Sequence, residues 1–103
     1  MSDFIIEISE AEIRRERDKS RELRKSRWWK NRLAQGRCHY CNGSFPPDEL
    51  TMDHIVPVTR GGKASRNNVV ACCKECNSRK KYLLPMEWEE FLEKARQNDE
   101  EDR

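Results

Sequence analysis

The sequence predicts a small α+β domain flanked by a long N-terminal helix and a C-terminal amphipathic helix. Residues 10–35 contain no Pro or Gly and consist mostly of good helix formers. Two short segments, 50–58 and 68–72, are rich in the β-branched residues that favour strands. Two closely spaced pairs of cysteines flank this strand-forming region, which indicates a domain held together by a bound metal.

The composition limits how large a core the chain can build. Of its 103 residues, 39% are charged and 35% hydrophobic, and the mean hydropathy is −1.10. A domain this small and polar usually needs a metal ion or disulfides for stability. The cysteine count of five is odd, the N-terminus lacks the pattern of a secretory leader, and no segment approaches membrane-spanning length. We therefore expect a cytoplasmic protein without membrane contact, whose cysteines bind metal.

The charge is unevenly distributed along the chain. The net charge is +2, yet residues 10–37 carry +6, residues 38–81 carry +3 and residues 82–103 carry −5. Basic stretches attract phosphate backbones, although a run of charges can also be a solvated helix face. The distribution favours a nucleic-acid partner and leaves both interpretations open for the N-terminal run.

Residues 1–37 are predicted to form a basic helical extension. The apolar run at 4–8 suggests a strand or docking segment, and Ser9 with Glu12 matches a capping box for the helix that follows. Apolar positions are too sparse for a wide core-facing stripe. We expect one long, largely exposed helix that docks through residues 28–33 and adds affinity for a duplex or binds a protein partner.

The rest of the chain divides into a core, residues 38–84, and a C-terminal region, residues 85–103. In the core, the two strand segments are followed by a predicted helix at 74–83. Residues 86–97 have the spacing of an amphipathic helix, with Trp88 on its apolar face. The last six residues are acidic and polar, so we expect them to be disordered.

Two C-x-x-C pairs, Cys38 with Cys41 and Cys73 with Cys76, predict a structural Zn²⁺ site. Four thiolates suit tetrahedral zinc, and each short spacing lets one turn present two sulfurs to the same ion. Unligated or redox-active thiols would leave the presence of both pairs unexplained. Because the protein would supply all four ligands, this zinc has no open position for catalysis. Cys72 falls outside the spacing and is assigned to packing.

The residues between the pairs carry the functional chemistry. A compact zinc ribbon separates its pairs by about 15–20 residues, whereas residues 42–72 intervene here. Asp53 and Asn77 offer the hard oxygen ligands that Mg²⁺ prefers. His54 has an ordinary pKa of about 6.5, which suits a general base at neutral pH. Adjacent strand residues point to opposite faces, so Asp53 and His54 require a bulge or a strand end, or they flank a phosphate from two sides.

The order of these motifs resembles the HNH endonuclease family, with its ββα-metal (His-Me finger) fold. The resemblance rests on the two cysteine pairs, on DHIVP at 53–57, on the paired glycines at 61–62 and on the sequence from 67 to 81. It implies a metal-dependent nuclease that hydrolyses phosphodiester bonds of DNA, with RNA as an alternative, and that uses Mg²⁺ or Mn²⁺.

The resemblance also implies a role for each residue of the H-N-N variant. His54 would activate the attacking water and Asp53 would bind the catalytic metal. Asn68, nine residues before Asn77, would brace the loop between the strands, and Asn67 is the alternative. Asn77 would be the third position and a second metal ligand, although its place near a helix start makes a capping role a rival.

Nearby basic side chains are expected to contact phosphates, which position a nucleic acid without specifying its sequence. They are Arg60, Lys63, Arg79, Lys80 and Lys81. The competing interpretation is a non-catalytic zinc-ribbon module that binds nucleic acid. That alternative explains the thiolates and the basic charge, but not the Asp-His pair, the paired glycines and the Cys-Asn junction together. The target and the oligomeric state are not determined by these patterns.

Overall fold

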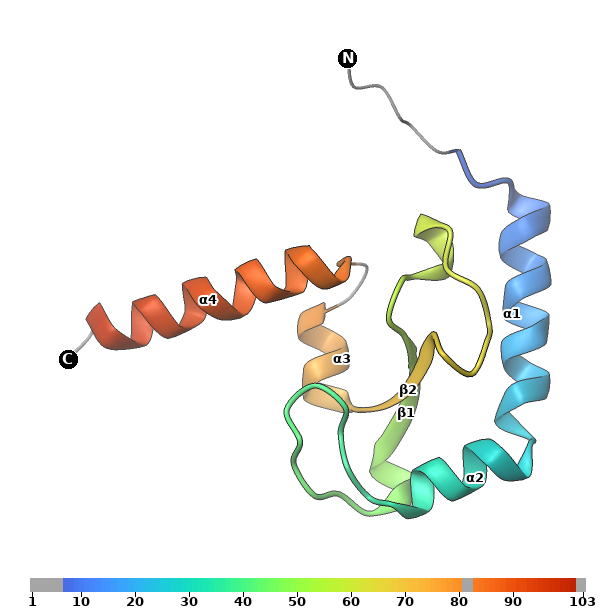
Figure 1. Cartoon of the computed structure of the whole chain (residues 1–103), viewed down its shortest axis with the longest axis horizontal. Coiled ribbons are helices and arrows are strands. Elements are labelled where there is room, and N and C mark those ends of the chain that lie inside the picture. The colour runs from blue at the N-terminus through green and yellow to red at the C-terminus, as the bar shows by residue number, and fades with distance from the viewer. Residues whose placement is uncertain (1–6, 81–82, 102–103) are drawn as a thin grey trace.

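The computed structural model describes residues 7–80 and 83–101. Two strands, β1 (Leu50–His54) and β2 (Val69–Cys73), form an antiparallel sheet, and α3 (Lys74–Lys80) follows β2 directly. The predicted α+β class is confirmed, and this ββα unit is surrounded by α1 (Glu10–Arg24), α2 (Arg27–Ala34) and α4 (Pro85–Glu101), with short 3-10 turns η1 (Pro47–Glu49) and η2 (Val58–Arg60) (Figure 1). Most of the apolar run at 4–8 and all of Lys81 lie outside the described residues.

The N-terminal region forms two helices, so the prediction of one long helix is wrong. The chain turns at Ser26, whose hydroxyl donates to the carbonyl of Leu23 (2.6 Å) and accepts the N–H of Trp29 (3.1 Å). Serine in this position caps the start of α2, because its oxygen satisfies a backbone N–H that lacks a helical partner. In Figure 1, α2 turns away from the line of α1 and passes beneath the sheet. Trp29 is then buried, which confirms that residues 28–33 dock on the core.

The first helix also contacts the core, and it does so through polar groups. Ser9 accepts the N–H of Glu12 (3.1 Å), as the capping pattern predicted. Further along, Glu16 and Ser20 are buried, and a carboxylate oxygen of Glu16 accepts the backbone N–H of Ala64 (2.9 Å). This hydrogen bond lowers the pKa of Glu16, so the carboxylate stays ionised. Because these side chains are polar, hydrophobic periodicity does not predict this docking.

The sheet is short because turns end its strands. Strand β1 is shorter than the predicted segment 50–58, because it ends at His54 and Pro57 caps the turn η2. Strand β2 is shifted by one residue from the predicted segment 68–72. The register pairs Asp53 with Val70 and His54 with Val69. All of β2 is buried. The core around it consists of Trp29, Cys38, Leu50, Ala71, Cys72, Cys73 and Cys76.

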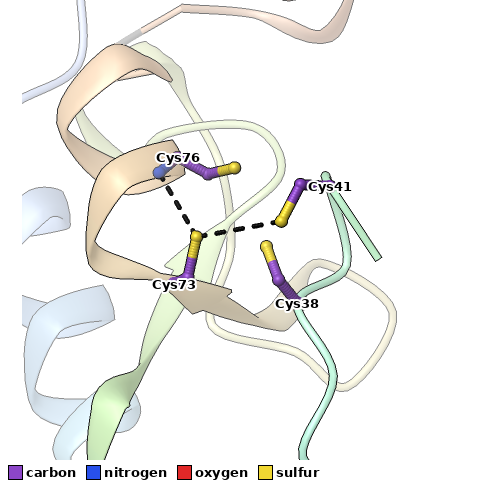
Figure 2. A group of neighbouring side chains, drawn as sticks. All are labelled: Cys38, Cys41, Cys73 and Cys76. Carbon is purple, nitrogen blue, oxygen red and sulfur yellow. Dashed lines mark hydrogen bonds between the residues drawn. The ribbon is translucent and has the colours of Figure 1, made fainter. Parts of the chain in front are cut away.

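Four cysteine sulfurs meet at one end of the sheet (Figure 2). The sulfurs of Cys38, Cys41, Cys73 and Cys76 all lie within 4.8 Å of one another, and those of Cys41 and Cys73 are 3.9 Å apart. A tetrahedral zinc with bonds of about 2.3 Å would separate its sulfurs by about 3.8 Å. The arrangement therefore fits one metal ion. Cys72 is fully buried in the core and does not join the cluster, in agreement with the packing role predicted for it.

The environment of Cys38 favours the form that binds metal. Burial alone would raise its pKa, but hydrogen bonds from the backbone of Cys41, Cys73 and Tyr40 outweigh that effect and lower the pKa to about 7. A thiolate is the metal ligand, so a sulfur with a lowered pKa is ready to coordinate. Burial raises the pKa of Cys41, so within the first C-x-x-C turn it is Cys38 that is prepared for an ion before the ion binds.

The C-terminal helix is longer than predicted. It covers the expected segment 86–97, and residues 98–101, predicted to be disordered, continue it. No Pro or Gly interrupts this stretch, and Glu100 and Glu101 are good helix formers; residues 102 and 103, also predicted to be disordered, lie outside the described residues. Only its first turns dock: Trp88 is buried between Tyr40 and a stacked Phe91, while Figure 1 shows the distal part of α4 extending away from the sheet. Among the described residues, no helix is both long and apolar enough to cross a membrane.

Replacing one metal-binding cysteine should unfold the core. For Cys38→Ser we expect loss of bound zinc and of the cooperative thermal transition. Zinc binding contributes about 10–16 kcal/mol in small zinc domains, which is as large as the whole free-energy difference of roughly 5–15 kcal/mol between folded and unfolded domains. Metal analysis and thermal denaturation measure both effects. Cys72→Ala is the matched control, since this variant should keep its zinc; equal melting curves for Cys38→Ser and wild type would contradict a structural metal.

Substitution of Gly62 should destabilise the loop that follows β1. A Cβ atom at this position would lie only 1.7 Å from the carbonyl oxygen of Val56, a backbone atom that cannot move aside freely. We expect Gly62→Ala to lower the free energy of unfolding by about 1–3 kcal/mol. Thermal or urea denaturation measures the change. Lys63→Ala, an exposed change in the same loop, should melt like the wild type, and a stable Gly62→Ala would show that the loop is adaptable.

Candidate functional site

A cavity of about 400 Å³ opens where β1 ends. Asp53, His54 and Asn77, predicted from the sequence to act together, all line it, so the fold brings them to one place. The helix α1 forms the other wall. The remaining lining residues are Arg17, Ser20, Arg21 and Arg24 from α1, and Pro57, Val58 and Thr59 from the turn after β1.

The end of β1 allows adjacent side chains to share this cavity. On a continuous strand Asp53 and His54 would point to opposite faces. His54 is the last residue of β1, and the chain leaves the sheet immediately after it. Of the alternatives that the sequence left open, the strand end is therefore the one observed.

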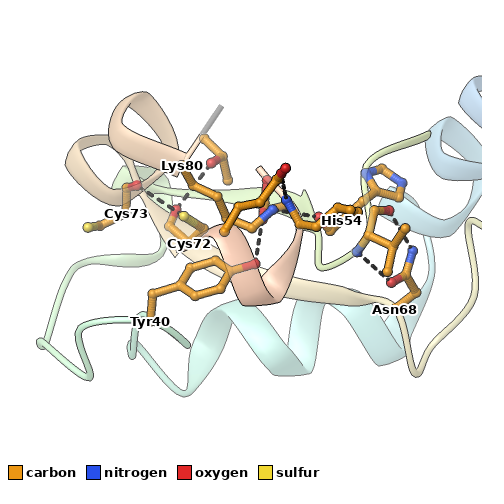
Figure 3. A network of polar contacts seen from close by, with 11 residues as sticks. Tyr40, His54, Asn68, Cys72, Cys73 and Lys80 are labelled. Carbon is orange, nitrogen blue, oxygen red and sulfur yellow. Dashed lines mark hydrogen bonds and ion pairs between the residues drawn. The ribbon is translucent and has the colours of Figure 1, made fainter. Parts of the chain in front are cut away.

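The carboxylate of Asp53 is held by half-buried Tyr40 and fully buried Lys80. Its Oδ2 accepts the hydroxyl proton of Tyr40 (2.6 Å) and lies 3.2 Å from the ammonium of Lys80. Lys80 also donates to the backbone carbonyl of His54 (3.0 Å), so one side chain binds both residues of the Asp-His pair (Figure 3). Burial, together with the hydrogen bond to Asp53, raises the pKa of Tyr40, which keeps this phenol protonated as a donor.

The prediction that Lys80 contacts phosphate is wrong. Its side chain is fully buried (0% exposed), because it lies on the inner face of α3 and points at the sheet. A buried ammonium is tolerated when a carboxylate and further hydrogen bonds compensate for the loss of water. Asp53 and the carbonyl of His54 provide that compensation. Lys80 therefore links α3 to the Asp-His pair and has no exposed surface for a phosphate.

Asn68 braces the loop between the strands. Its side-chain amide donates to the carbonyls of Val56 (3.1 Å) and Lys63 (2.8 Å), and its Oδ1 accepts the N–H of Val56 (2.9 Å). These three bonds fix the segment that carries the paired glycines. Asn67, the alternative, accepts a hydrogen bond from Ser65 (2.6 Å), and its side chain has no bond to the loop carbonyls among the described residues. The geometry agrees with the bracing position expected for Asn68.

The imidazole of His54 is partly buried and in contact with α1. Its Nε2 lies 2.8 Å from the hydroxyl oxygen of Ser20. Burial lowers the pKa of His54; the positive charges of Arg24 and Lys80 add to this effect, and Asp53 opposes it. The ring is therefore neutral at pH 7, which is the form able to accept a proton.

Asn77 is exposed in the middle of α3, at the cavity. The helix begins at Lys74, so the capping role that rivalled metal binding does not fall to Asn77. That place is taken by Cys73, whose sulfur accepts the N–H of Cys76 (3.5 Å). The amide of Asn77 is thus presented on a helix whose start is held by the cysteine cluster.

The remaining basic residues predicted to contact phosphate differ in whether they form ion pairs within the protein. Arg60 is paired with Glu87 (3.2 Å) and Arg79 with Glu75 (2.7 Å), while Lys63 is exposed. None of these three lines the cavity with His54.

The arginines that line the cavity were missed by the sequence analysis. Arg17, Arg21 and Arg24 are exposed on α1, and with Ser20 they recur at intervals of three and four residues. Such spacing places side chains on one face of a helix. The signal was present, but among the eleven basic residues of segment 10–37 no local feature marks the face that meets His54.

Comparison with known proteins identifies the core. No curated protein matches the chain. The family model described as HNH endonuclease matches residues 38–90, just over half of the chain, and covers both cysteine pairs, the Asp-His pair and Asn77. The helices α1 and α2 lie outside the match. With the ββα core and the four-cysteine cluster already described, this match shows that the chain belongs to the HNH endonuclease family.

Proposed function

We propose that this protein is a metal-dependent endonuclease that hydrolyses phosphodiester bonds of DNA. The observation that carries the proposal is the shared cavity, where Asp53, His54 and Asn77 face arginines of α1. A neutral imidazole beside hard oxygen ligands and cationic side chains matches the needs of phosphodiester hydrolysis.

His54 acts as the general base. It takes a proton from a water molecule as the water oxygen attacks phosphorus, and the bond from phosphorus to the leaving sugar oxygen breaks. The leaving oxygen is protonated from solvent. Burial keeps His54 neutral and so ready for the first of these steps. Its backbone is fixed by Lys80, which limits movement of the base relative to the metal ligands.

Asp53 and Asn77 would hold the catalytic cation. A carboxylate and a carboxamide oxygen are hard donors that suit Mg²⁺ or Mn²⁺, and Mg²⁺ commonly takes only one or two protein ligands beside water and phosphate. When bound, such a cation neutralises charge on the phosphate and on the leaving oxygen. Tyr40 and Lys80 fix the orientation of the Asp53 carboxylate for this task.

Phosphates of the substrate would bind along α1. The guanidinium groups of Arg17, Arg21 and Arg24 line the cavity wall opposite the Asp-His pair, and arginine can bind phosphate through two parallel hydrogen bonds. Lys63 and Arg79, both exposed, would extend the basic surface. A single-stranded or RNA substrate presents the same phosphates and remains the alternative. A protein partner that binds through the N-terminal helical region also stays a prediction, as does the division of the chain at residues 37 and 84.

Removing the base should abolish cleavage without unfolding the protein. For His54→Ala we expect cutting of supercoiled plasmid in Mg²⁺ or Mn²⁺ to fall by about 10²–10⁴-fold, the usual contribution of general base catalysis. The chain has two histidines, and exposed His39 provides the matched control. His39→Ala should cut like the wild type. A wild type that binds DNA and leaves it intact with every metal would favour the non-catalytic zinc-ribbon module.

Removing arginines from the cavity wall should weaken binding in a salt-dependent manner. For the double variant Arg17→Ala, Arg24→Ala, the slope of log affinity against log salt concentration should decrease by about 0.9 for each duplex phosphate that the variant no longer neutralises. Fluorescence anisotropy of labelled duplex DNA gives the slope when it is measured on the zinc-loaded protein without added Mg²⁺ or Mn²⁺, so that cutting is prevented and the structural zinc is kept. Arg15→Ala removes a charge from a residue of α1 outside the cavity and serves as control. An unchanged slope in the double variant would place the DNA elsewhere.

A further inference from the structure

Two hydrogen bonds meet at the hydroxyl of Ser20, deep between α1 and the end of β1. The Ser20 oxygen lies 2.8 Å from Nε2 of His54 and 2.8 Å from the backbone carbonyl oxygen of Glu16, one helical turn earlier. The residue is 2% exposed. It also lies outside residues 38–90, the part of the chain that matches the HNH family.

A serine hydroxyl has a single proton, so its two contacts cannot both be donations. The Glu16 carbonyl can only accept, and serine commonly donates to the carbonyl four residues before it in a helix. If Ser20 donates to this carbonyl, its oxygen accepts the N–H of His54 Nε2, and both contacts are hydrogen bonds. If Ser20 instead donated to Nε2, two oxygens with lone pairs would face each other at 2.8 Å without a proton between them. The first arrangement is the one that satisfies every group.

We propose that Ser20 is a positioning residue that holds neutral His54 as the tautomer protonated at Nε2, which leaves the lone pair on Nδ1. The consequence for catalysis rests on the proposed nuclease function: Nδ1 is the atom that accepts the proton of the attacking water. In the described part of the chain, no group bonds to Nδ1. In this arrangement the imidazole donates to Ser20, and Ser20 donates to the Glu16 carbonyl.

The Ser20–His54 contact resembles the pairing of a nucleophilic serine with its general base, but Ser20 cannot act as a nucleophile here. A nucleophilic serine must reach the substrate and give its proton to the histidine. Ser20 is almost fully buried and its proton is committed to the Glu16 carbonyl. Its role is to orient the imidazole, and the attacking group is water.

The position of Ser20 is fixed independently of His54. One turn earlier in α1, Glu16 accepts the backbone N–H of Ala64, in the loop that Asn68 braces. The helix α1 is thus hydrogen-bonded to the loop through Glu16 and, one turn later, to the imidazole of His54 through Ser20. An element outside the matched family region therefore completes the site.

Nitrogen NMR of the wild-type, zinc-loaded chain tests the tautomer directly. With ¹⁵N-labelled histidine and a pH well above the ordinary pKa of histidine, long-range ¹H–¹⁵N correlations distinguish protonated from unprotonated ring nitrogens. We expect His54 to show a protonated Nε2 and an unprotonated Nδ1. A wild-type signal with the proton on Nδ1 would overturn the proposal, whether or not the protein cuts DNA.

Substitution of Ser20 tests the consequence. Ser20→Ala should reduce kcat for plasmid cleavage on the order of 10–100-fold, by analogy with the loss of a hydrogen-bond partner that orients a metal-bound histidine, with little change in KM. Ser20→Thr keeps a hydroxyl and should recover part of the lost rate. Glu22→Gln, on α1 but outside the cavity, controls for changes in the helix itself.

The outcomes separate this proposal from the nuclease function. A wild type without cleavage activity but with the expected NMR tautomer would refute the function and keep the positioning role. Unchanged or increased kcat in a folded Ser20→Ala variant would overturn that role, because an orienting bond cannot be removed without loss of rate. If Ser20→Ala unfolds, the wild-type NMR spectrum still decides the tautomer.

Discussion

The four-cysteine cluster is the constraint on which the rest of the structure depends. The sheet has only two strands, and a chain with 35% hydrophobic residues has little apolar surface to bury. A metal ion bound by Cys38, Cys41, Cys73 and Cys76 would replace part of the missing core. It would also join two segments more than thirty residues apart, so that the intervening hairpin must close over a fixed base. In the described part of the chain, the first cysteine turn is also joined to β2 by the hydrogen bond from the His39 N–H to the Ala71 carbonyl (2.8 Å), and a shared metal ion would add a far stronger link.

The same junction positions the candidate site through the short helix α3. Within seven residues, this helix carries the metal ligand Cys76, the cavity residue Asn77 and the buried Lys80. Cys73 caps its start, and Lys80 reaches from its end to Asp53 and to the backbone of His54. The orientation of Asn77 relative to the Asp-His pair is therefore set by thiolates at one end of the helix and an ion pair at the other. A metal bound at this cluster would thereby set the geometry of the candidate site without taking part in its chemistry.

The sequence predicted the parts of this arrangement that depend on local spacing. The C-x-x-C pairs, the ββα order and the juxtaposition of Asp53, His54 and Asn77 follow from motif spacing and from residue chemistry. Prediction failed where tertiary contacts determine the direction of a side chain or the end of a helix. The inward direction of Lys80 depends on a buried carboxylate partner, and the break at Ser26 depends on the burial of Trp29. The face of α1 that meets the core is polar, so hydrophobic periodicity gave no indication of it.

That polar face explains why α1 can act as part of the site. An apolar stripe would hold a helix against the sheet but would leave some freedom to rotate and slide, since hydrophobic contact has no direction. Glu16 and Ser20 instead bind through directional hydrogen bonds to Ala64 and His54. These two bonds, one turn apart, fix both the rotation of the helix and its height along the axis. The register in turn determines that Arg17, Arg21 and Arg24, on the same face, line the cavity instead of facing solvent elsewhere. The two hydrogen bonds that dock the helix therefore also determine which of its side chains line the cavity.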